Sequence, residues 1–235
     1  GVSRPDALLI DFGGTLALER VSRASIYRDA ALRLGCDVTV PRMADLMGES
    51  HRALPADEPM RYTRAWFERF IERIFGAELG LGAEDVSAAR SELFARFADP
   101  ATFRVFPDAR ALLGAARAAG VSVAIVSNWT DTLDTLAASL ELGPFAAIAS
   151  SASLGVEKPD AGIFEWALER IGVAPDRALH VGDSWPNDVV GARALGIEAV
   201  MLERGGGEGR GIDTLEALVP RFADPGGGPA GQSSS

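Results

Sequence analysis

The chain has 235 residues, 47% of them hydrophobic and 24% charged, which is enough apolar material for one large domain or two small ones and excludes a disordered or collagen-like chain. A formal net charge of −10 argues against nucleic acid as a partner, because an acidic surface repels phosphate backbones. No window approaches the roughly 18 consecutive apolar residues of a membrane helix, and the first residues lack the pattern of a secretory signal, so we expect a cytoplasmic protein with no membrane partner.

Five short apolar runs predict strands that are buried on both faces of a sheet. They span residues 7–10, 121–126, 145–149, 178–181 and 198–202. Amphipathic stretches between them predict helices, each ending near a glycine, the residue that most readily adopts a left-handed conformation after a helix. These helices span 108–119, 131–141, 160–171 and 186–195, and the glycines are Gly120, Gly143, Gly172 and Gly196. The alternation of strand and helix predicts an α/β fold with a doubly wound, Rossmann-like parallel sheet and right-handed crossovers.

The interval 17–104 breaks this alternation, because its apolar periodicity is helical throughout and it contains no convincing strand. The helical stretches span 21–34, 39–50, 59–76 and 83–98. We therefore expect a helical cap inserted into a core of residues 1–16 and 105–205, with its two linkers side by side and the cap above the carboxyl ends of the strands. Residues 206–235 are rich in glycine and contain one short helical candidate at 213–219, so we interpret them as a C-terminal segment and tail.

Polar residues follow three of the predicted strands. Asp11 ends the first, Ser127 and Asn128 end the second, and Asp183 ends the fourth. Each residue alone has an ordinary interpretation as a turn or helix cap, but ligands of open parallel sheets bind beyond the carboxyl ends of the strands, so together they predict a site there. Lys158 is the only lysine in the chain, which favours a specific role for its compact ammonium group over a solvated surface position.

Four segments, taken in order, resemble the motifs of the haloacid dehalogenase-like hydrolase superfamily, in the subfamily with a helical cap between the first and second motifs. They are DFGGTL at 11–16, SN at 127–128, EKPD at 157–160 and GDSWPND at 182–188. The resemblance covers about residues 6–205. It implies a doubly wound parallel sheet and, as in most members, a Mg²⁺-dependent phosphatase that forms an aspartyl-phosphate.

The chemistry of these residues suggests their roles once they share a pocket. Asp11 is the expected nucleophile, because an ionised carboxylate held in line can attack phosphorus. Ser127 and Lys158 are the other expected catalytic residues, with Asn128 beside them in binding the phosphoryl group. We also expect the glycine-rich turn to present backbone N–H groups to a phosphoryl oxygen. That turn consists of Gly13, Gly14 and Thr15.

Mg²⁺ prefers octahedral oxygen ligands and keeps several waters, so few protein ligands suffice. We expect Asp11, Asp183 and the carbonyl of Gly13 to bind it, with Asp188 as a direct ligand or as support behind the ligands. A helical cap over this site would exclude water and admit small molecules, so a small phosphorylated metabolite is the expected substrate of a monomer or homodimer.

Position 13 departs from the family pattern. Phosphatases of the superfamily usually have a second aspartate there that protonates the leaving oxygen, and such a group contributes on the order of 10²- to 10⁴-fold in rate. One consequence is a phosphatase that acts on good leaving groups or takes its proton donor from the cap, where His51, Asp57 and Tyr62 are available. The phosphonatases, which also lack this aspartate, need a lysine in the cap, and residues 17–104 contain none.

Two alternatives remain open at this stage. A 2-haloacid dehalogenase of the same superfamily needs neither the second aspartate nor a metal; Asn128 favours it, whereas Asp183 opposes it, since those enzymes resemble one another in placing uncharged residues in the fourth motif. A non-catalytic relative that binds a phosphorylated ligand or a protein is the other. For the stripe of Trp66, Phe70 and neighbouring apolar residues, we favour packing in the core of the cap over contact with a substrate.

Overall fold

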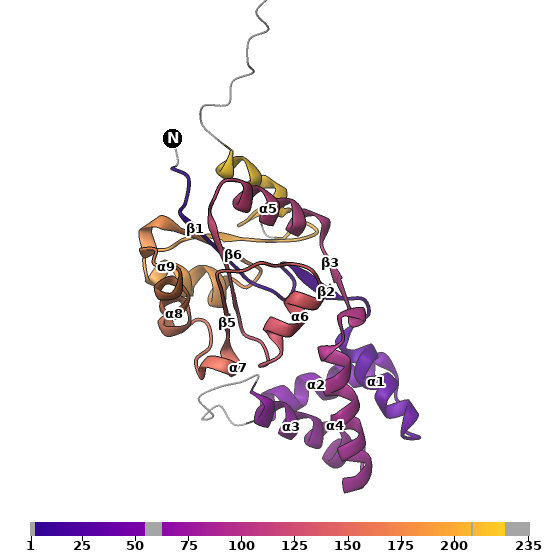
Figure 1. Cartoon of the computed structure of the whole chain (residues 1–235). Helices are drawn as coiled ribbons and strands as arrows, with labels where there is room; N and C mark the ends of the chain where they lie inside the picture. The colour runs from indigo at the N-terminus through magenta and orange to yellow at the C-terminus, as the bar shows by residue number, and fades with distance from the viewer. Residues whose placement is uncertain (1–2, 55–62, 208, 224–235) are drawn as a thin grey trace, which may run out of the picture.

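The computed structural model describes residues 3–54, 63–207 and 209–223. Its centre is a five-stranded sheet in the order β5-β4-β1-β6-β7, with every neighbouring pair parallel. The strands are β1 (Ala7–Ile10), β4 (Ser122–Ser127), β5 (Ala147–Ser150), β6 (Ala178–Gly182) and β7 (Glu198–Met201). The predicted doubly wound parallel sheet is confirmed, and β1 lies at its centre with β4 and β6 on either side (Figure 1).

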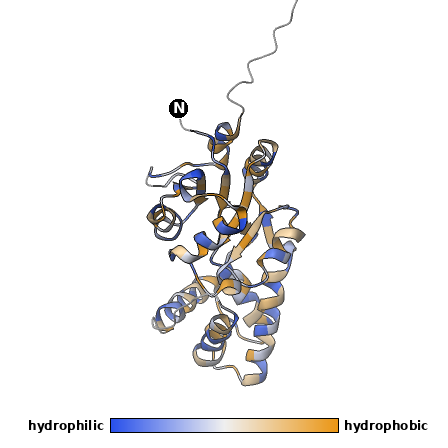
Figure 2. Cartoon of the chain, turned by 60° about the vertical axis from the view of Figure 1, so that its left-hand side comes forward, coloured by the Kyte–Doolittle hydropathy of each residue, from blue (hydrophilic) through white to orange (hydrophobic). Residues whose placement is uncertain are grey.

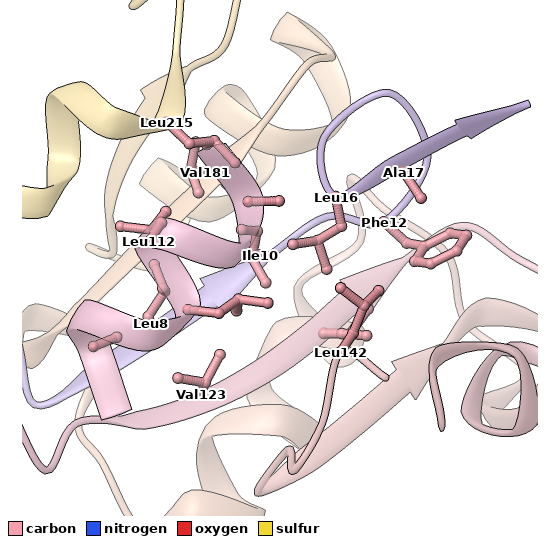
Figure 3. Packing of buried hydrophobic residues seen from close by; sticks show 14 of the residues in the cluster. Leu8, Ile10, Phe12, Leu16, Ala17, Leu112, Val123, Leu142, Val181 and Leu215 are labelled. Carbon is pink, nitrogen blue, oxygen red and sulfur yellow. The ribbon is translucent and has the colours of Figure 1, made fainter. Parts of the chain in front are cut away.

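Both faces of the sheet are covered by helices. Leu8 and Ile10 of β1 point into an apolar cluster with α5 (Pro107–Ala118), α6 (Leu133–Ser139) and the 3₁₀ helix η5 (Leu215–Phe222), part of which Figure 3 shows. Ala7 and Leu9 point to the opposite face. That face packs against α8 (Ala161–Ile171), the π-helical turn η4 (Trp185–Val190) and α9 (Gly191–Ala194). Short elements α7 (Ser151–Leu154) and η3 (Pro175–Arg177) complete the connections.

The helix ends agree with the sequence at three of four glycines. Gly120, Gly172 and Gly196 have positive φ angles after their helices, as predicted. Gly143 was expected to do the same, and this is wrong: Glu141 takes the left-handed conformation, with φ at 55°. The chain turns earlier because α6 ends at Ser139, which places a non-glycine residue at the turn.

A second group of helices packs around its own apolar core. It comprises α1 (Arg23–Arg33), α2 (Val40–Ala53), α3 (Arg64–Glu72), the π-helical η1 (Arg73–Glu78) and α4 (Ala83–Ala98). The side chains of Ser22, Thr39 and Thr63 each accept a hydrogen bond from the first turn of the helix that follows, which explains where α1, α2 and α3 begin. We call this group the cap; the exact division of the chain into core and cap remains our interpretation.

The expectation that 17–104 holds no strand is wrong. The strand β2 (Ala17–Glu19) pairs antiparallel with β3 (Phe103–Val105), and η2 (Pro100–Thr102) precedes β3. Each strand has three residues, too few for a period of two to show in the sequence, and their pairing joins positions more than 80 residues apart. This ribbon is where the chain leaves the sheet for the cap and returns, so the two linkers lie side by side (Figure 1).

Hydrophobic residues concentrate on the central strands and on the inward sides of the helices (Figure 2). In the described part of the chain, no helix combines the length and the apolar character that crossing a membrane requires. The described N-terminal end lies on the side of the sheet opposite the cap, and the carboxyl ends of the strands face the cap (Figure 1).

Candidate active site

A cavity of about 440 Å³ lies between the core and the cap, and the predicted site residues meet at its floor. Asp11 follows β1, Ser127 ends β4, and Asp183 follows β6. Lys158 comes from the segment before α8, and Asp188 comes from η4. All five line the cavity, because the carboxyl ends of parallel strands meet at one edge of the sheet.

Lys158 is 3% exposed and bridges two carboxylates. Its Nζ donates hydrogen bonds to Asp11 Oδ1 at 2.8 Å and to Asp188 Oδ1 at 2.6 Å. His180 Nε2 donates to the same Asp188 oxygen at 2.8 Å, and the backbone N–H of Ser184 donates to Asp188 Oδ2 at 3.0 Å. The lone lysine is therefore buried in the site, and the alternative of a solvated surface residue is wrong.

The charges of this cluster shift one another's protonation. Burial raises the pKa of Asp11, and the ammonium group of Lys158 opposes that rise. Burial acts in the same direction on Asp188, but Lys158 and the hydrogen bond from His180 hold the pKa of Asp188 below its usual range. Burial disfavours the charged form of Lys158, yet the two carboxylates raise its pKa overall. The arrangement thus keeps Lys158 charged beside Asp11.

Asp11, Asp183 and Asp188 form a group whose carboxylate oxygens lie within 4.8 Å of one another. Loss of surrounding water, followed by the charges of Asp11 and Asp188, raises the pKa of Asp183 to about 7, although its side chain remains open to the cavity. When all three carboxyl groups are ionised, one ammonium group leaves two negative charges uncompensated, a set that an oxygen-preferring divalent cation fits. Asp188 already accepts three hydrogen bonds, which suits it to support behind the ligands more than to direct contact.

Two glycines make room for these carboxylates. A Cβ atom added at Gly14 would overlap the carboxylate of Asp183, and one added at Gly182 would overlap that of Asp188. Gly14 also has a φ of 76°, which side chains other than glycine rarely adopt. The sequence motifs therefore need glycine at both positions because the acidic group packs directly against the backbone.

The turn after Asp11 differs from the expectation. The backbone N–H groups of Gly14 and Thr15 donate to Ala17 O and Phe12 O, at 2.9 and 3.3 Å, and so hold the turn together. The prediction that they bind a phosphoryl oxygen does not agree with these bonds. Within the described residues, the N–H groups of Phe12 and Gly13 have no such acceptor, and Gly13 lines the cavity. The role of Gly13 as a phosphate and metal contact stays a prediction.

Asn128 binds the backbone of Lys158 on both sides. Its Nδ2 donates to Lys158 O at 2.9 Å, and its Oδ1 accepts from Lys158 N at 2.7 Å. These two hydrogen bonds fix the backbone of Lys158 relative to the end of β4, a role of Asn128 that the sequence did not reveal. Ser127 is 2% exposed and lies beside Asp11, where it opposes the rise that burial causes in the pKa of Asp11. The predicted phosphate contacts of both residues remain predictions.

Arg204 is a supporting residue that sequence reasoning missed. Its guanidinium donates to Gly14 O at 3.2 Å and Thr15 O at 2.9 Å, and it forms a bidentate pair with Asp108 at 2.7 and 2.9 Å. Asp108 also accepts hydrogen bonds from Thr214 Oγ1 and Leu215 N. These contacts tie the turn after Asp11 to α5 and η5. Arg204 lies in a glycine-rich segment, and no local pattern marks it.

Position 13 is closed to a side chain by Trp129. A Cβ atom added at Gly13 would lie 2.9 Å from Cζ3 of the Trp129 ring. That ring packs edge-on against Phe12, with centroids 4.9 Å apart, and against Phe103 at 6.0 Å. The usual second aspartate is therefore absent from the sequence, and its place is also filled. A single Gly13→Asp substitution would collide with the indole.

The cap forms an apolar wall over the cavity. Trp66 and Phe70, assigned to the cap core from sequence, are indeed buried, but they also line the cavity. Other apolar side chains in this wall are Tyr27, Met47, Phe67, Ile71, Leu93, Phe94 and Phe97. His51, one of the proton donors that the sequence offers in the cap, lines the cavity, with its ring 5.7 Å from that of Trp66. Asp57 and Tyr62, the other expected proton donors, lie outside the described residues.

Glu19 and Arg23 also line the cavity, and the sequence analysis did not single them out. Arg23 Nε donates to Glu19 Oε1 at 2.6 Å, and its guanidinium lies 5.8 Å from the centre of the Trp129 ring. They sit at the junction of β2 and α1, where the cap leaves the core.

Comparison with known proteins identifies the class to which this fold and site belong. The model of the haloacid dehalogenase-like hydrolase family matches residues 5–196, and the chain belongs to this family. A phosphoserine phosphatase from Thermus thermophilus is 34% identical over 143 residues, which are 60% of this chain and 57% of the relative. A phosphoglycolate phosphatase from Nitrosospira multiformis is 32% identical over 71% of this chain and 77% of its own length.

Solved structures agree on the fold. The putative hydrolase YfnB from Bacillus subtilis, in a form bound to magnesium, superimposes with a TM-score of 0.69 at 21% identity, over 94% of this chain and 99% of YfnB. At 21% identity, this structural similarity is evidence for the fold alone. The match to the first of the curated relatives spans little more than half of that protein's length.

Proposed function

We propose that the protein is a Mg²⁺-dependent phosphatase that hydrolyses a small phosphate monoester through an aspartyl-phosphate on Asp11. The observation that supports this most is the buried Lys158, which bridges Asp11 and Asp188 beside the exposed carboxylate of Asp183. Family membership and the two relatives named as phosphatases of small phosphate esters support the same activity. Cytoplasmic location and a monomeric or homodimeric state stay predictions.

The residues of this chain account for the first step. Asp11 accepts a hydrogen bond from Lys158 at 2.8 Å, so the ammonium group favours the ionised carboxylate against the effect of burial and fixes its orientation for attack on phosphorus. Lys158 and Ser127 lie next to the same carboxylate and can donate to the oxygens of the transferred group, where negative charge concentrates. His180 and Asn128 act one step further out, by fixing Asp188 and the backbone of Lys158.

The acidic group would hold Mg²⁺ through Asp11 and Asp183, with the Gly13 carbonyl as a third protein contact and Asp188 behind them. Bound there, the ion supplies charge neutralisation that lets a phosphate dianion approach a carboxylate nucleophile. The nucleophile itself is shielded from water, since Asp11 is 6% exposed, whereas the carboxylate of Asp183 is open to the cavity.

The test is phosphate release from a panel of small phosphate monoesters, with Mg²⁺ and with EDTA. We expect turnover that EDTA abolishes and Mg²⁺ restores. Chloride release from 2-chloropropionate in the absence of metal would instead establish the dehalogenase activity, and turnover of neither kind would leave a binding protein. The exposed Asp183 carboxylate disfavours the dehalogenase, since it would repel a carboxylate substrate.

A further inference from the structure

Two independent features at the site bear on which phosphate ester it accepts. The first is that position 13 offers no group that can protonate a leaving oxygen. Gly13 has no side chain, and a Cβ atom there would lie 2.9 Å from the ring of Trp129. The indole cannot easily withdraw: its ring packs against Phe12 and Phe103, its backbone N–H donates to Ser151 Oγ at 3.1 Å, and its carbonyl accepts from Ser150 Oγ at 3.0 Å. The leaving group therefore departs past an aromatic face where relatives with the second aspartate have an acid.

The other titratable groups that line the cavity do not replace that acid. Glu19 is 8% exposed, and its carboxylate is already engaged by Arg23 at 2.6 Å, so it does not face a leaving group. Burial raises the pKa of Tyr27 above its ordinary value, which makes it a weaker acid. His51 lies on the cap side with its ring edge-on to Trp66. Asp183 and Lys158 also line the cavity, but the proposed function assigns them to the metal ion and to the charge of the transferred group. Among the described residues, His51 is then the remaining candidate acid for a basic alkoxide.

The second feature is the shape and chemistry of the cavity wall. Trp66 and Phe70 stack at 4.9 Å with 15° between their planes, and they face the cavity together with Phe94 and Met47 of the cap and Trp129 of the core. Such a wall favours a flat apolar group. A carboxylate-bearing leaving group would need a cation, and Arg23, the one guanidinium on the cap side of the described lining, is already paired with Glu19.

We propose that the natural substrate class is the phosphate monoesters of phenols, with the aromatic ring seated between Trp129 and the stacked rings of Trp66 and Phe70. This rests on the proposed phosphatase function. A phenolate has a conjugate acid of pKa about 10, as in tyrosine, so it leaves without a proton. An alkoxide is nearly as basic as hydroxide, whose conjugate acid has a pKa of about 15.7, and needs one.

The bonds balance without a co-reactant other than water. An oxygen of Asp11 forms a bond to phosphorus while the bond from phosphorus to the aryl oxygen breaks, and the aryl oxygen keeps the bonding pair and later takes a proton from solvent. Water then attacks the same phosphorus, the bond to Asp11 breaks, and the proton of that water passes to the phosphate released.

The experiment compares kcat/KM for phenyl phosphate, benzyl phosphate and phosphoglycolate with Mg²⁺ present. Phenyl and benzyl phosphates share an aromatic ring, so their ratio isolates the leaving oxygen. We expect phenyl phosphate to exceed benzyl phosphate by about 10²-fold or more, the contribution of a missing acid, and both to exceed phosphoglycolate. Similar values for phenyl and benzyl phosphate, or a preference for phosphoglycolate, would overturn the proposal. Hydrolysis of another phosphate ester but of none of these three would overturn the proposal, whereas hydrolysis of no phosphate ester at all would contradict the phosphatase function itself.

Variants sharpen the comparison. The double variant Gly13→Asp/Trp129→Ala removes the indole and supplies a carboxyl group, so we expect the ratio of phenyl to benzyl phosphate to fall by about tenfold or more, through faster benzyl phosphate hydrolysis. Trp129→Ala alone is the matched control and leaves the ratio high.

His51→Gln should slow both esters by the same factor. A selective loss of benzyl phosphate hydrolysis in that variant would identify His51 as the acid and contradict the proposal. If the double variant does not fold, the rates of substituted phenyl phosphates on the unaltered protein decide: a steep dependence on the pKa of the phenol supports the proposal, and a flat one overturns it.

Discussion

The floor and the roof of the cavity are built from opposite kinds of side chain. On the floor, the buried ammonium group of Lys158 donates hydrogen bonds to the buried carboxyl groups of Asp11 and Asp188, at 2.8 and 2.6 Å. The roof, contributed by the cap, consists mainly of aromatic and aliphatic side chains such as Trp66 and Phe70. A charged network fixes geometry for one reaction, whereas an apolar wall selects by shape and by the absence of polar partners. Under the proposed function, the core therefore supplies the reacting groups and the cap supplies the surface that selects the substrate.

The largest expected effect tests the floor. Asp11→Asn removes the nucleophile while keeping the shape of the side chain, so we expect phosphatase turnover to fall by about 10⁵-fold or more in a steady-state assay. Asp6→Asn is the matched control: Asp6 lies at the other end of β1 in an exposed pair with Arg177, and its loss should leave turnover unchanged. Turnover in Asp11→Asn comparable to that of the control would remove the covalent mechanism.

Lys158 provides the next test. Lys158→Met removes the cation between Asp11 and Asp188, and we expect kcat to fall by about 10²- to 10³-fold, the range seen when a group that stabilises developing charge is lost. Lys158→Arg should not restore the rate, because the planar guanidinium does not fit a site where the lysine is 3% exposed. Full activity of the arginine variant would show that charge alone suffices.

The support beneath the floor is expected to matter for stability. Asp108→Ala leaves Arg204 without its bidentate partner and Leu215 N without its acceptor, so we expect the free energy of unfolding to fall by about 3 kcal/mol in chemical denaturation. Asp6→Ala breaks an exposed, solvent-screened pair and should cost far less stability than Asp108→Ala. Equal losses for the two variants would mean that the contacts of Arg204 carry no special weight.

A smaller effect is expected with pH. The hydrogen bonds from Arg204, Leu215 and Thr214 outweigh burial and lower the pKa of Asp108 below 3.8. A carboxyl group whose pKa is lower in the folded state stabilises the fold above its unfolded pKa, and this contribution is lost as the pH falls through the folded value. The stability difference between the unaltered protein and Asp108→Asn should therefore shrink between pH 6 and pH 3 (about one pKa unit below the unfolded value). A constant difference would assign the loss to packing.

Much of the floor could be predicted from sequence because its residues stand at strand ends, and strand ends are visible as the points where buried apolar runs stop. Asp11, Ser127 and Asp183 are found in this way, and their convergence follows from the parallel sheet. Lys158 stood out through its uniqueness in the chain. The hydrogen bonds could not be predicted from the sequence. Those between Asn128 and the backbone of Lys158, and those within the turn at Gly14, depend on the folded arrangement of the chain.

The roof could be predicted less well. Helical periodicity identified α1 to α4, but periodicity marks which residues are buried and does not say whether they face a core or a cavity, so the double role of Trp66 and Phe70 stayed hidden. The ribbon of β2 and β3 was missed because three-residue strands carry no pattern. Trp129 follows the second motif directly, yet its position over Gly13 is set by packing against Phe12 and Phe103, from two other segments.

The most direct measurement is the binding of Mg²⁺ by isothermal titration calorimetry, for the unaltered protein and for Asp183→Asn at neutral to mildly alkaline pH. If the acidic residues of the floor share one ion, the unaltered protein binds a single equivalent, and loss of the exposed carboxylate weakens that affinity by about tenfold or more. Equal binding by both proteins, or no binding by either, would contradict the shared site on which the proposed chemistry depends.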